Sequence, residues 1–175
     1  MHYSKTCGLA AALLLATVTG PAIAADKPND AQIAHIAYTA GDLDVKAAAL
    51  ALQKSKTESV RAFANNMVQD HKAVNDKALA LVKKLNVTPE DNDTSKGLVK
   101  QANEKAAELG KLSGAAFDKA YVDNEVAYHK TVNGALANTL IPSASNSELK
   151  SLLETGLKIF QGHEQHAEKL ASELK

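Results

Sequence analysis

Apolar residues recur at helical spacing along most of this sequence, and the pattern is clearest between Val60 and Leu85. Steps of three or four residues separate the apolar positions there, which are Val60, Ala64, Met67, Val74, Ala78, Leu81 and Leu85. This period predicts a helix that buries one face in a bundle. The series is interrupted once, between Met67 and Val74, where His71 takes the place of a hydrophobic residue. A titratable ring is therefore expected on a buried face, near the middle of a helix.

The composition limits the class of protein. The chain has 175 residues, enough for one domain with a substantial core, and it has no Trp and few aromatic residues. Its many Ala, Lys and Glu residues favour helix. The formal net charge is zero, whereas proteins that bind nucleic acid or an anionic membrane surface carry a basic excess. Neither is expected as a partner.

Residues 1–25 have the features of a secretory signal peptide. His2 and Lys5 precede an apolar run at residues 8–18, and Ala22-Ile23-Ala24 supplies small residues at a cleavage site. The run is shorter than the roughly 20 residues that span a bilayer, and no later segment is apolar enough to do so. We expect cleavage after Ala24 or Ala25, and an exported, periplasmic protein whose residues 26–175 form a single helical-bundle domain.

Several kinds of catalytic site find no support in the sequence. The only cysteine, Cys7, lies in the expected signal peptide, so thiolate catalysis, disulfides and Cys-ligated metals are not expected. The sequence contains no Gly-rich phosphate loop, no nucleophile elbow and no His-Glu-x-x-His motif. Catalysis is therefore not predicted.

The spacing of caps and breakers predicts four long helices and one shorter helix. Asp30, Thr57 and Ser113 are candidate N-caps, and Pro142 marks a turn before the last helix. The helices are expected at about residues 30–53, 57–86, 95–110, 113–138 and 147–174. The connection after residue 86 is long enough to cross the length of a bundle. This all-α pattern predicts a ferritin-like four-helix bundle, in which a long crossover containing the shorter helix joins two helical hairpins.

Polar residues from all four long helices fall at a similar depth in this arrangement. His71, His129 and His163 lie near the middle of the second, third and fourth long helices, where apolar residues are expected. Asp44 and Glu125 lie near the middle of the first and third. Buried imidazoles need partners, so these side chains are expected to meet one another, a carboxylate or a metal ion.

A transition-metal site is one interpretation of this polar layer. Imidazole nitrogens suit zinc, copper and iron, and bundle cores hold such sites. The preferred ligands are His71, His129 and His163, with Asp44 or Glu125 as the carboxylate. His166, three residues after His163, is a further possible ligand. Asp70 and Tyr121 are candidates for orienting an imidazole.

Other interpretations remain open. The layer is also explained as a hydrogen-bonded network that fixes the register of the helices, or as a proton-linked switch. Asp44 stands beside Leu43 at the edge of the apolar face, where a solvated carboxylate is the simpler expectation. The alternative function is a non-enzymatic interaction or stress-protective protein of the cell envelope, in which the histidines are structural.

Three stretches carry a family resemblance. They are Phe63-Ala-Asn-Asn-Met-Val-Gln-Asp-His71, Leu112-Ser-Gly-Ala-Ala-Phe-Asp-Lys-Ala-Tyr121, and His163 followed by Ala167. Together they resemble a bacterial family of exported proteins with a ferritin-like domain of unknown function, often labelled outer membrane proteins. The resemblance covers about residues 30–174. It implies a ferritin-like four-helix bundle and an exported location, and it implies no activity.

The sequence departs from the ferritin-like pattern at two positions. Di-iron bundles place a glutamate three residues before each ligand histidine. Val68 precedes His71 by three residues, and Phe160 precedes His163 by three. Both carboxylates are missing, so di-iron chemistry is not expected. A histidine-rich site for a single metal ion, or no metal, is what the pattern allows.

Overall fold

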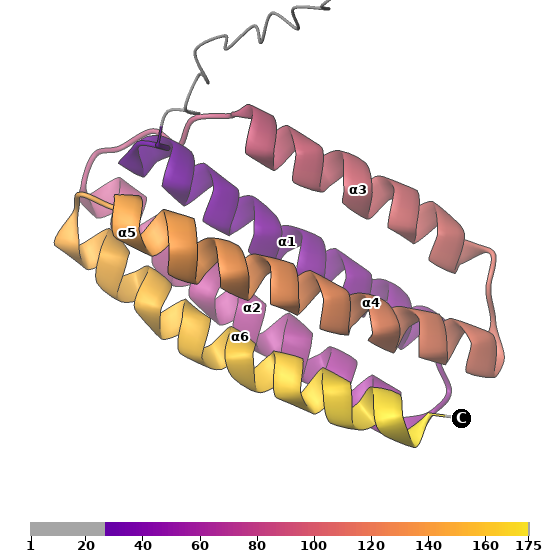
Figure 1. Ribbon diagram of the computed structural model, residues 1–175. Coiled ribbons are helices and arrows are strands. Elements are labelled where there is room, and N and C mark those ends of the chain that lie inside the picture. The colour runs from indigo at the N-terminus through magenta and orange to yellow at the C-terminus, as the bar shows by residue number, and fades with distance from the viewer. Residues whose placement is uncertain (1–26, 175) are drawn as a thin grey trace, which may run out of the picture.

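The computed structural model describes residues 27–174, which form helices joined by loops, with no strand among them (Figure 1). The expected signal peptide lies outside the described residues. A π-helical turn, Leu136–Leu140, follows α4. The α-helices are α1 (Asp30–Lys54), α2 (Glu58–Lys84), α3 (Asp93–Gly110), α4 (Gly114–Ala135), α5 (Ile141–Ser143) and α6 (Ser147–Glu173).

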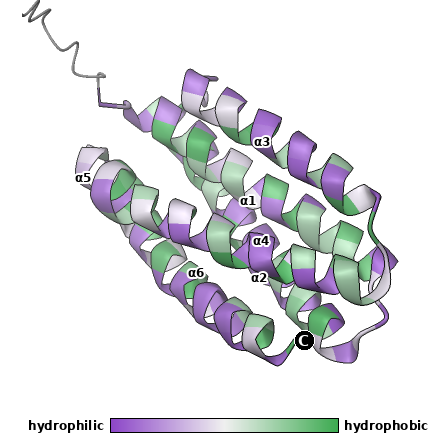
Figure 2. Cartoon of the chain, turned by 45° about the vertical axis from the view of Figure 1, so that its right-hand side comes forward, coloured by the Kyte–Doolittle hydropathy of each residue, from purple (hydrophilic) through white to green (hydrophobic). Residues whose placement is uncertain are grey.

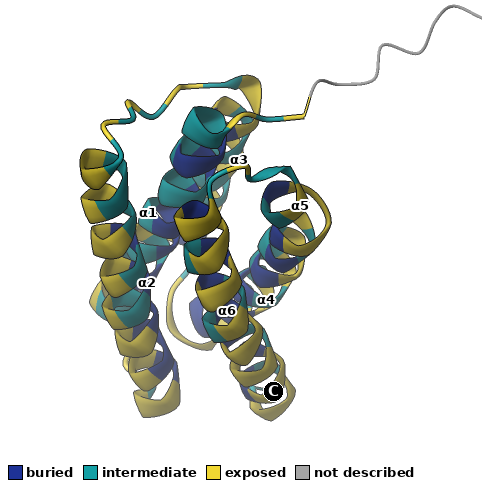
Figure 3. Cartoon of the chain, turned by 90° about the vertical axis from the view of Figure 1, so that its left-hand side faces the viewer, coloured by how far each residue is buried: buried dark blue, intermediate teal, exposed yellow. Residues whose placement is uncertain are grey.

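The long helices pack as a bundle. Helix α1 lies along α2, α4 lies along α6, and both pairs contact each other, while α3 packs along α1 (Figure 1). Hydrophobic and hydrophilic residues alternate along each long helix (Figure 2). The buried residues lie on the inner sides of the helices and the exposed ones on the outer sides (Figure 3). The expected helical period therefore corresponds to real burial.

Two apolar clusters occupy the interior, one toward each end of the bundle. The first contains Phe63, Met67, Phe117, Tyr121 and Leu170, among others. The second is composed of Ile33, Ile36, Leu136, Leu140, Leu149, Leu153 and Phe160. Along α1, α4 and α6, the expected polar residues fall between the members of these two clusters. The polar layer thus separates two hydrophobic cores.

Helix α1 is capped one residue earlier than the sequence suggested. Asn29, not Asp30, is the N-cap, and it forms a capping box with Gln32. The two carboxylate oxygens of Asp30 instead accept hydrogen bonds from the backbone N–H groups of Ser145 and Asn146, at 2.8 and 2.9 Å. The carboxylate therefore ties the start of α1 to the loop before α6.

The turn expected at Pro142 begins later than predicted. The chain stays helical through the π-helical turn and α5, as far as Ser143. Pro142 lies in the first positions of α5, where proline is tolerated because no helical partner is needed for its missing N–H. The loop is therefore confined to the residues between Ser143 and Ser147.

The long connection between α2 and α4 contains a helix, as predicted. Helix α3 begins at Asp93, two residues before the expected start, because Asn92 is its N-cap and forms a capping box with Ser95. None of the described helices combines the length and the apolar character required for crossing a membrane.

Two glycines in helices offer a matched test of the packing between α1 and α2. A β-carbon at Gly41 would lie 2.5 Å from Oδ1 of Asn75, whereas nothing lies within 4 Å of one at Gly97 on α3. Asn75 is buried, and its amide donates to the carbonyl oxygen of Tyr38. We expect Gly41→Ala to lower the free energy of unfolding by about 1–3 kcal/mol through overpacking. Gly97→Ala should raise it by about 0.5–1 kcal/mol.

Urea unfolding monitored by circular dichroism measures both changes. If the two substitutions shifted stability in the same direction, the close packing of Gly41 against Asn75 would be contradicted.

Candidate metal centre

Five polar side chains meet inside the bundle, and we refer to them as the polar centre. They are contributed by all four long helices, and none is more than 7% exposed. The members are Asp44 from α1, His71 from α2, Glu125 and His129 from α4, and His163 from α6. These residues lie at the same depth because each is near the middle of its helix, on or beside the buried face.

The three histidines are mutual neighbours. The ring centroids are 5.7 Å apart for His71 and His129, 5.3 Å for His71 and His163, and 5.6 Å for His129 and His163. One ring nitrogen from each lies within 4.8 Å of the other two. Ligand atoms of Asp44, Glu125 and His129 form a second group within the same limit. His129 belongs to both groups and joins them.

Asp44 is buried, which corrects the expectation of a solvated carboxylate. It is 2% exposed, and its Oδ2 lies 3.0 Å from Nε2 of His71 and 3.3 Å from Nε2 of His129. Neither contact has the alignment of a hydrogen bond, and Oδ1 has no hydrogen-bond partner. The carboxylate therefore faces two imidazoles and keeps unused acceptor capacity.

Hydrogen bonds around the centre set the tautomers of two histidines. Nδ1 of His129 is 3.0 Å from the backbone carbonyl oxygen of Glu125, which can only accept, so Nδ1 carries the proton. Nε2 of His163 donates to Oδ2 of Asp70 at 2.9 Å. Asp70 thus orients an imidazole, the role considered for it from the sequence. In both rings the second nitrogen is buried and has no hydrogen-bond partner.

His71 is held by stacking. Its ring lies parallel to that of Phe160, with centroids 4.4 Å apart and an interplanar angle of 5°. Both of its ring nitrogens are buried without a hydrogen-bond partner. Phe160 occupies the position three residues before His163, where a di-iron bundle has a glutamate. An apolar ring therefore lies beside the histidines where a carboxylate would be needed.

Burial and neighbouring charges shift the pKa values of the groups in the polar centre in different directions. Burial opposes ionisation of Asp44, but its interactions with His71 and then His129 outweigh burial and lower its pKa to about 2. Burial and the neighbouring charge of Asp44 raise the pKa of Glu125 well above its usual value. Burial lowers the pKa of His129, and it lowers that of His163 to about 4 despite the bond to Asp70.

At neutral pH the centre therefore contains an ionised Asp44, a protonated Glu125, and neutral rings at His129 and His163. Neutral imidazoles and a carboxylate are the forms that bind metal ions. In the rings of His129 and His163, the second nitrogen carries a lone pair that accepts no hydrogen bond from the protein. Chemically, this is a cation-binding arrangement with one negative charge.

Two residues considered from the sequence lie apart from these contacts. His166 is exposed, and its ring packs edge-on against that of Phe63, with the ring centroids 5.1 Å apart. It belongs to neither group of ligand atoms. Tyr121 is buried, and its hydroxyl has no hydrogen-bond partner. Burial, together with the charges of Glu125 and Asp44, raises the pKa of that hydroxyl well above its usual value.

Asp118 is a further buried carboxylate, and it was not among the residues expected at a site. It accepts a hydrogen bond from the hydroxyl of Thr57, the residue at the start of α2, and so links α2 to α4. Thr57 occupies the predicted N-cap position, but its side chain makes no cap hydrogen bond. The signal for Asp118 was its place directly after Phe117 and three residues before Tyr121, at the border of the apolar face.

Comparison with known proteins identifies one match. Residues 16–170 match a family described as Domain of unknown function (DUF4142). No curated protein and no solved structure matches the chain. The matched range includes every residue of the polar centre. Because the match covers most of the sequence, the chain belongs to this family of unknown function.

Proposed function

We propose that this is an exported, periplasmic protein whose ferritin-like four-helix bundle binds one transition-metal ion. His71, His129 and His163 supply the nitrogen ligands, and Asp44 supplies the carboxylate. The observation that carries the proposal is the pattern of ring nitrogens. Each of the three buried rings has a nitrogen without a hydrogen-bond partner, and the other nitrogen of two of them donates to an oxygen outside the group.

That pattern is the usual arrangement around protein-bound metals. A ligating histidine donates its second ring N–H to a carboxylate or a backbone carbonyl, which fixes the tautomer and the direction of the lone pair. Asp70 and the carbonyl of Glu125 are placed to do this for His163 and His129. Without an ion, burying so many unpaired polar atoms costs free energy.

The donor set supports particular metals. Three imidazole nitrogens and one carboxylate suit zinc, copper or iron, while calcium and magnesium prefer sites made of oxygen. Asp44 supplies the negative charge that a buried cation requires. Glu125, protonated at neutral pH, is a reserve carboxyl group that becomes a ligand only if it loses its proton.

Export is supported by the sequence alone. The apolar run at residues 8–18 and the small residues at positions 22 and 24 fit a protein that is exported across the inner membrane.

A structural role for the histidines is the main alternative. The bonds from His163 to Asp70 and from His129 to Glu125 join α6 to α2 and stiffen α4 without any metal. The stress-protective or interaction role would instead use an exposed apolar surface. Among the described residues, the exposed large hydrophobic side chains are Leu79 on α2 and Val99 on α3, two single residues on different helices.

Metal titration of histidine variants tests the proposal. The chain without its signal peptide and without a His-tag should bind about one equivalent of Zn²⁺ or Cu²⁺. His129→Ala and His163→Ala should weaken binding by about a hundredfold or more, and Asp70→Asn by about 10–100-fold. His166→Ala is the matched control, because this exposed histidine lies outside the centre, and it should bind as the parent chain does. Isothermal titration calorimetry gives the stoichiometry and affinity.

Thermal unfolding separates loss of a ligand from loss of the fold. Metal should raise the melting temperature of the parent chain and of His166→Ala, since an ion that binds only the folded state stabilises it. The structural alternative would prevail if the parent chain showed no stoichiometric metal and no thermal shift with added Zn²⁺ or Cu²⁺.

The pH dependence of stability in the metal-free protein tests the burial of His163. Its pKa is lowered to about 4 in the folded state, against a usual value of 6.5. As the pH falls, the unfolded chain therefore takes up a proton on His163 before the folded protein does. The contribution of His163 to the free energy of unfolding is complete above pH 6.5 and declines toward pH 4. The free energy of unfolding changes by at most about 1.4 kcal/mol per pH unit through this group.

Urea unfolding of the metal-free parent and of His163→Gln between pH 7 and pH 4 measures this contribution. The stability difference between the two proteins should shift in favour of the variant as the pH falls. Comparison with the variant is needed because Glu125, whose pKa is raised, has the opposite pH dependence. A difference that stayed constant over this range would contradict the proposed environment of His163.

A further inference from the structure

A cleft of about 610 Å³ runs between α1, α3 and α4. Helix α3 packs along α1 (Figure 1) and also contacts α4. The cleft has the size of the pockets in which proteins bind small organic molecules, about 300–1,000 Å³. Its lining includes residues of the polar centre from α1 and α4, and none from α2 or α6.

The hollow arises from small side chains on the facing helices. The inner face of α3 carries Leu98 and Leu109 toward its two ends, with Ala102 and Ala106 between them. Ala47 on α1 and Ala127 on α4 also line the cleft. The leucines at the two ends of α3 keep its axis away from the neighbouring helices, and the alanine side chains between them are too short to fill the space. The walls are consequently apolar and open.

The inner wall of the cleft is acidic. Asp44 and Glu125 both line it, although each is almost completely buried. Oδ2 of Asp44 faces the histidines, and Oδ1 accepts no hydrogen bond from a protein N–H group. Buried acceptors without donors are costly. A ligand that brings N–H donors would satisfy them.

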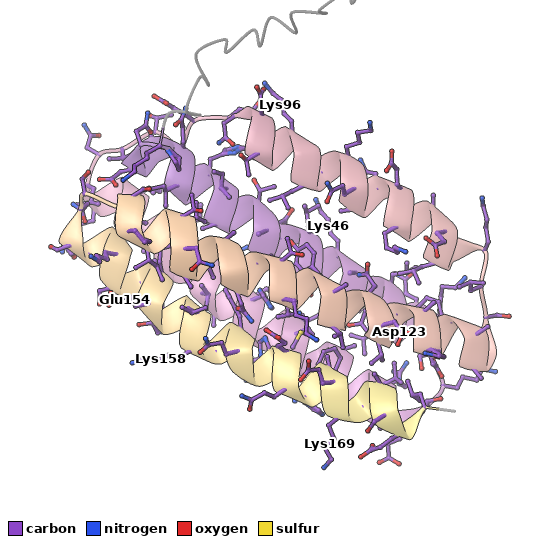
Figure 4. All side chains as sticks on the ribbon, viewed as in Figure 1. Lys46, Lys96, Asp123, Glu154, Lys158 and Lys169 are labelled. Atoms are coloured by element: carbon purple, nitrogen blue, oxygen red, sulfur yellow. The ribbon has the colours of Figure 1, made fainter. Side chains whose placement is uncertain are left out.

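The rim offers no free positive charge to an anionic ligand. Of the two lysines that line the cleft, Lys46 (Figure 4) pairs with Asp42 at 2.7 Å, and Lys105 pairs with Glu108 at 2.6 Å. Their charges are compensated locally, and neither lysine forms an ion pair with Asp44 or Glu125. The cleft is therefore complementary to a cation with an apolar body.

We propose that this cleft binds a small organic amine. The apolar body lies against the alanine and leucine walls, and the ammonium group donates a hydrogen bond to the ionised carboxylate of Asp44. Hydrogen bonds between ions are about twice as strong as those between neutral groups, so the charge of the ligand decides its affinity. This site does not depend on metal binding, and because Asp44 belongs to both sites, zinc and the amine compete.

Calorimetry on the metal-free chain without its signal peptide tests the choice of ligand. The probes share one apolar body: 2-phenylethylamine, 2-phenylethanol and 3-phenylpropanoate. We expect the amine to bind about tenfold more tightly than the alcohol, and the carboxylate to bind more weakly than either. Absence of binding, or equal binding of the amine and the carboxylate, would overturn the proposal.

Two neighbouring alanines on α3 provide matched variants. Ala106→Trp fills the cleft and should abolish amine binding. Ala107→Trp, at an exposed position outside the cleft, should leave amine binding unchanged. Asp44→Asn should remove the preference for the amine over the alcohol. Equal effects of the two tryptophan substitutions would also refute the site.

Zinc titration of the same proteins keeps this inference separate from the metal site. Ala106→Trp should still bind zinc, because it does not alter the polar centre. Amine binding without zinc binding would overturn the proposed function alone, and zinc binding without amine binding would overturn this inference alone.

Discussion

A buried carboxylate in contact with two imidazoles is the interaction on which the rest of this bundle depends. Ionised Asp44 sits inside the protein at a desolvation cost of several kcal/mol, which only close and well-placed partners can offset. His71 and His129, at 3.0 and 3.3 Å, come from two other helices. The three helices must therefore keep one rotation and one depth relative to each other. A shift in register would move the carboxylate away from His71, whose interaction contributes most to lowering the pKa of Asp44.

The apolar clusters on either side make such a polar layer possible. Phe63, Phe117 and Tyr121 are completely buried on one side, and Ile33 with its neighbours closes the other. Hydrophobic burial of this extent offsets the cost of burying the polar groups between the two clusters. The centre can then contain polar atoms that would be satisfied only when a ligand is bound. The ring nitrogens without a hydrogen-bond partner are such atoms.

The sequence was sufficient to predict the histidine layer but not the state of its members. Helical period fixes which face a residue occupies, and the position of His71, His129 and His163 near the middle of their helices placed them at one depth. Burial of Asp44 was one of two expectations, and the outcome depends on how α1 packs against α2 and α4, tertiary contacts that no local pattern records. The tautomers of His129 and His163 also depend on partners in space. For the same reason the continuation of helix through Pro142 was missed, since a proline is compatible with a new first turn.

Charge counting distinguishes a site for one ion from a site for two. Dinuclear centres in bundles surround their ions with several ionised carboxylates. Here Phe160 stacks on His71 where one such carboxylate would be, and Glu125 retains its proton beside Asp44. Of the two carboxyl groups in the centre, Asp44 is ionised and Glu125 is not. One divalent ion therefore leaves a smaller excess of positive charge than two ions would, in a medium that screens charge poorly. Loss of the Glu125 proton would reduce the excess further. The same electrostatics that raise the pKa of Glu125 in the empty protein would therefore favour its ionisation once a cation is bound.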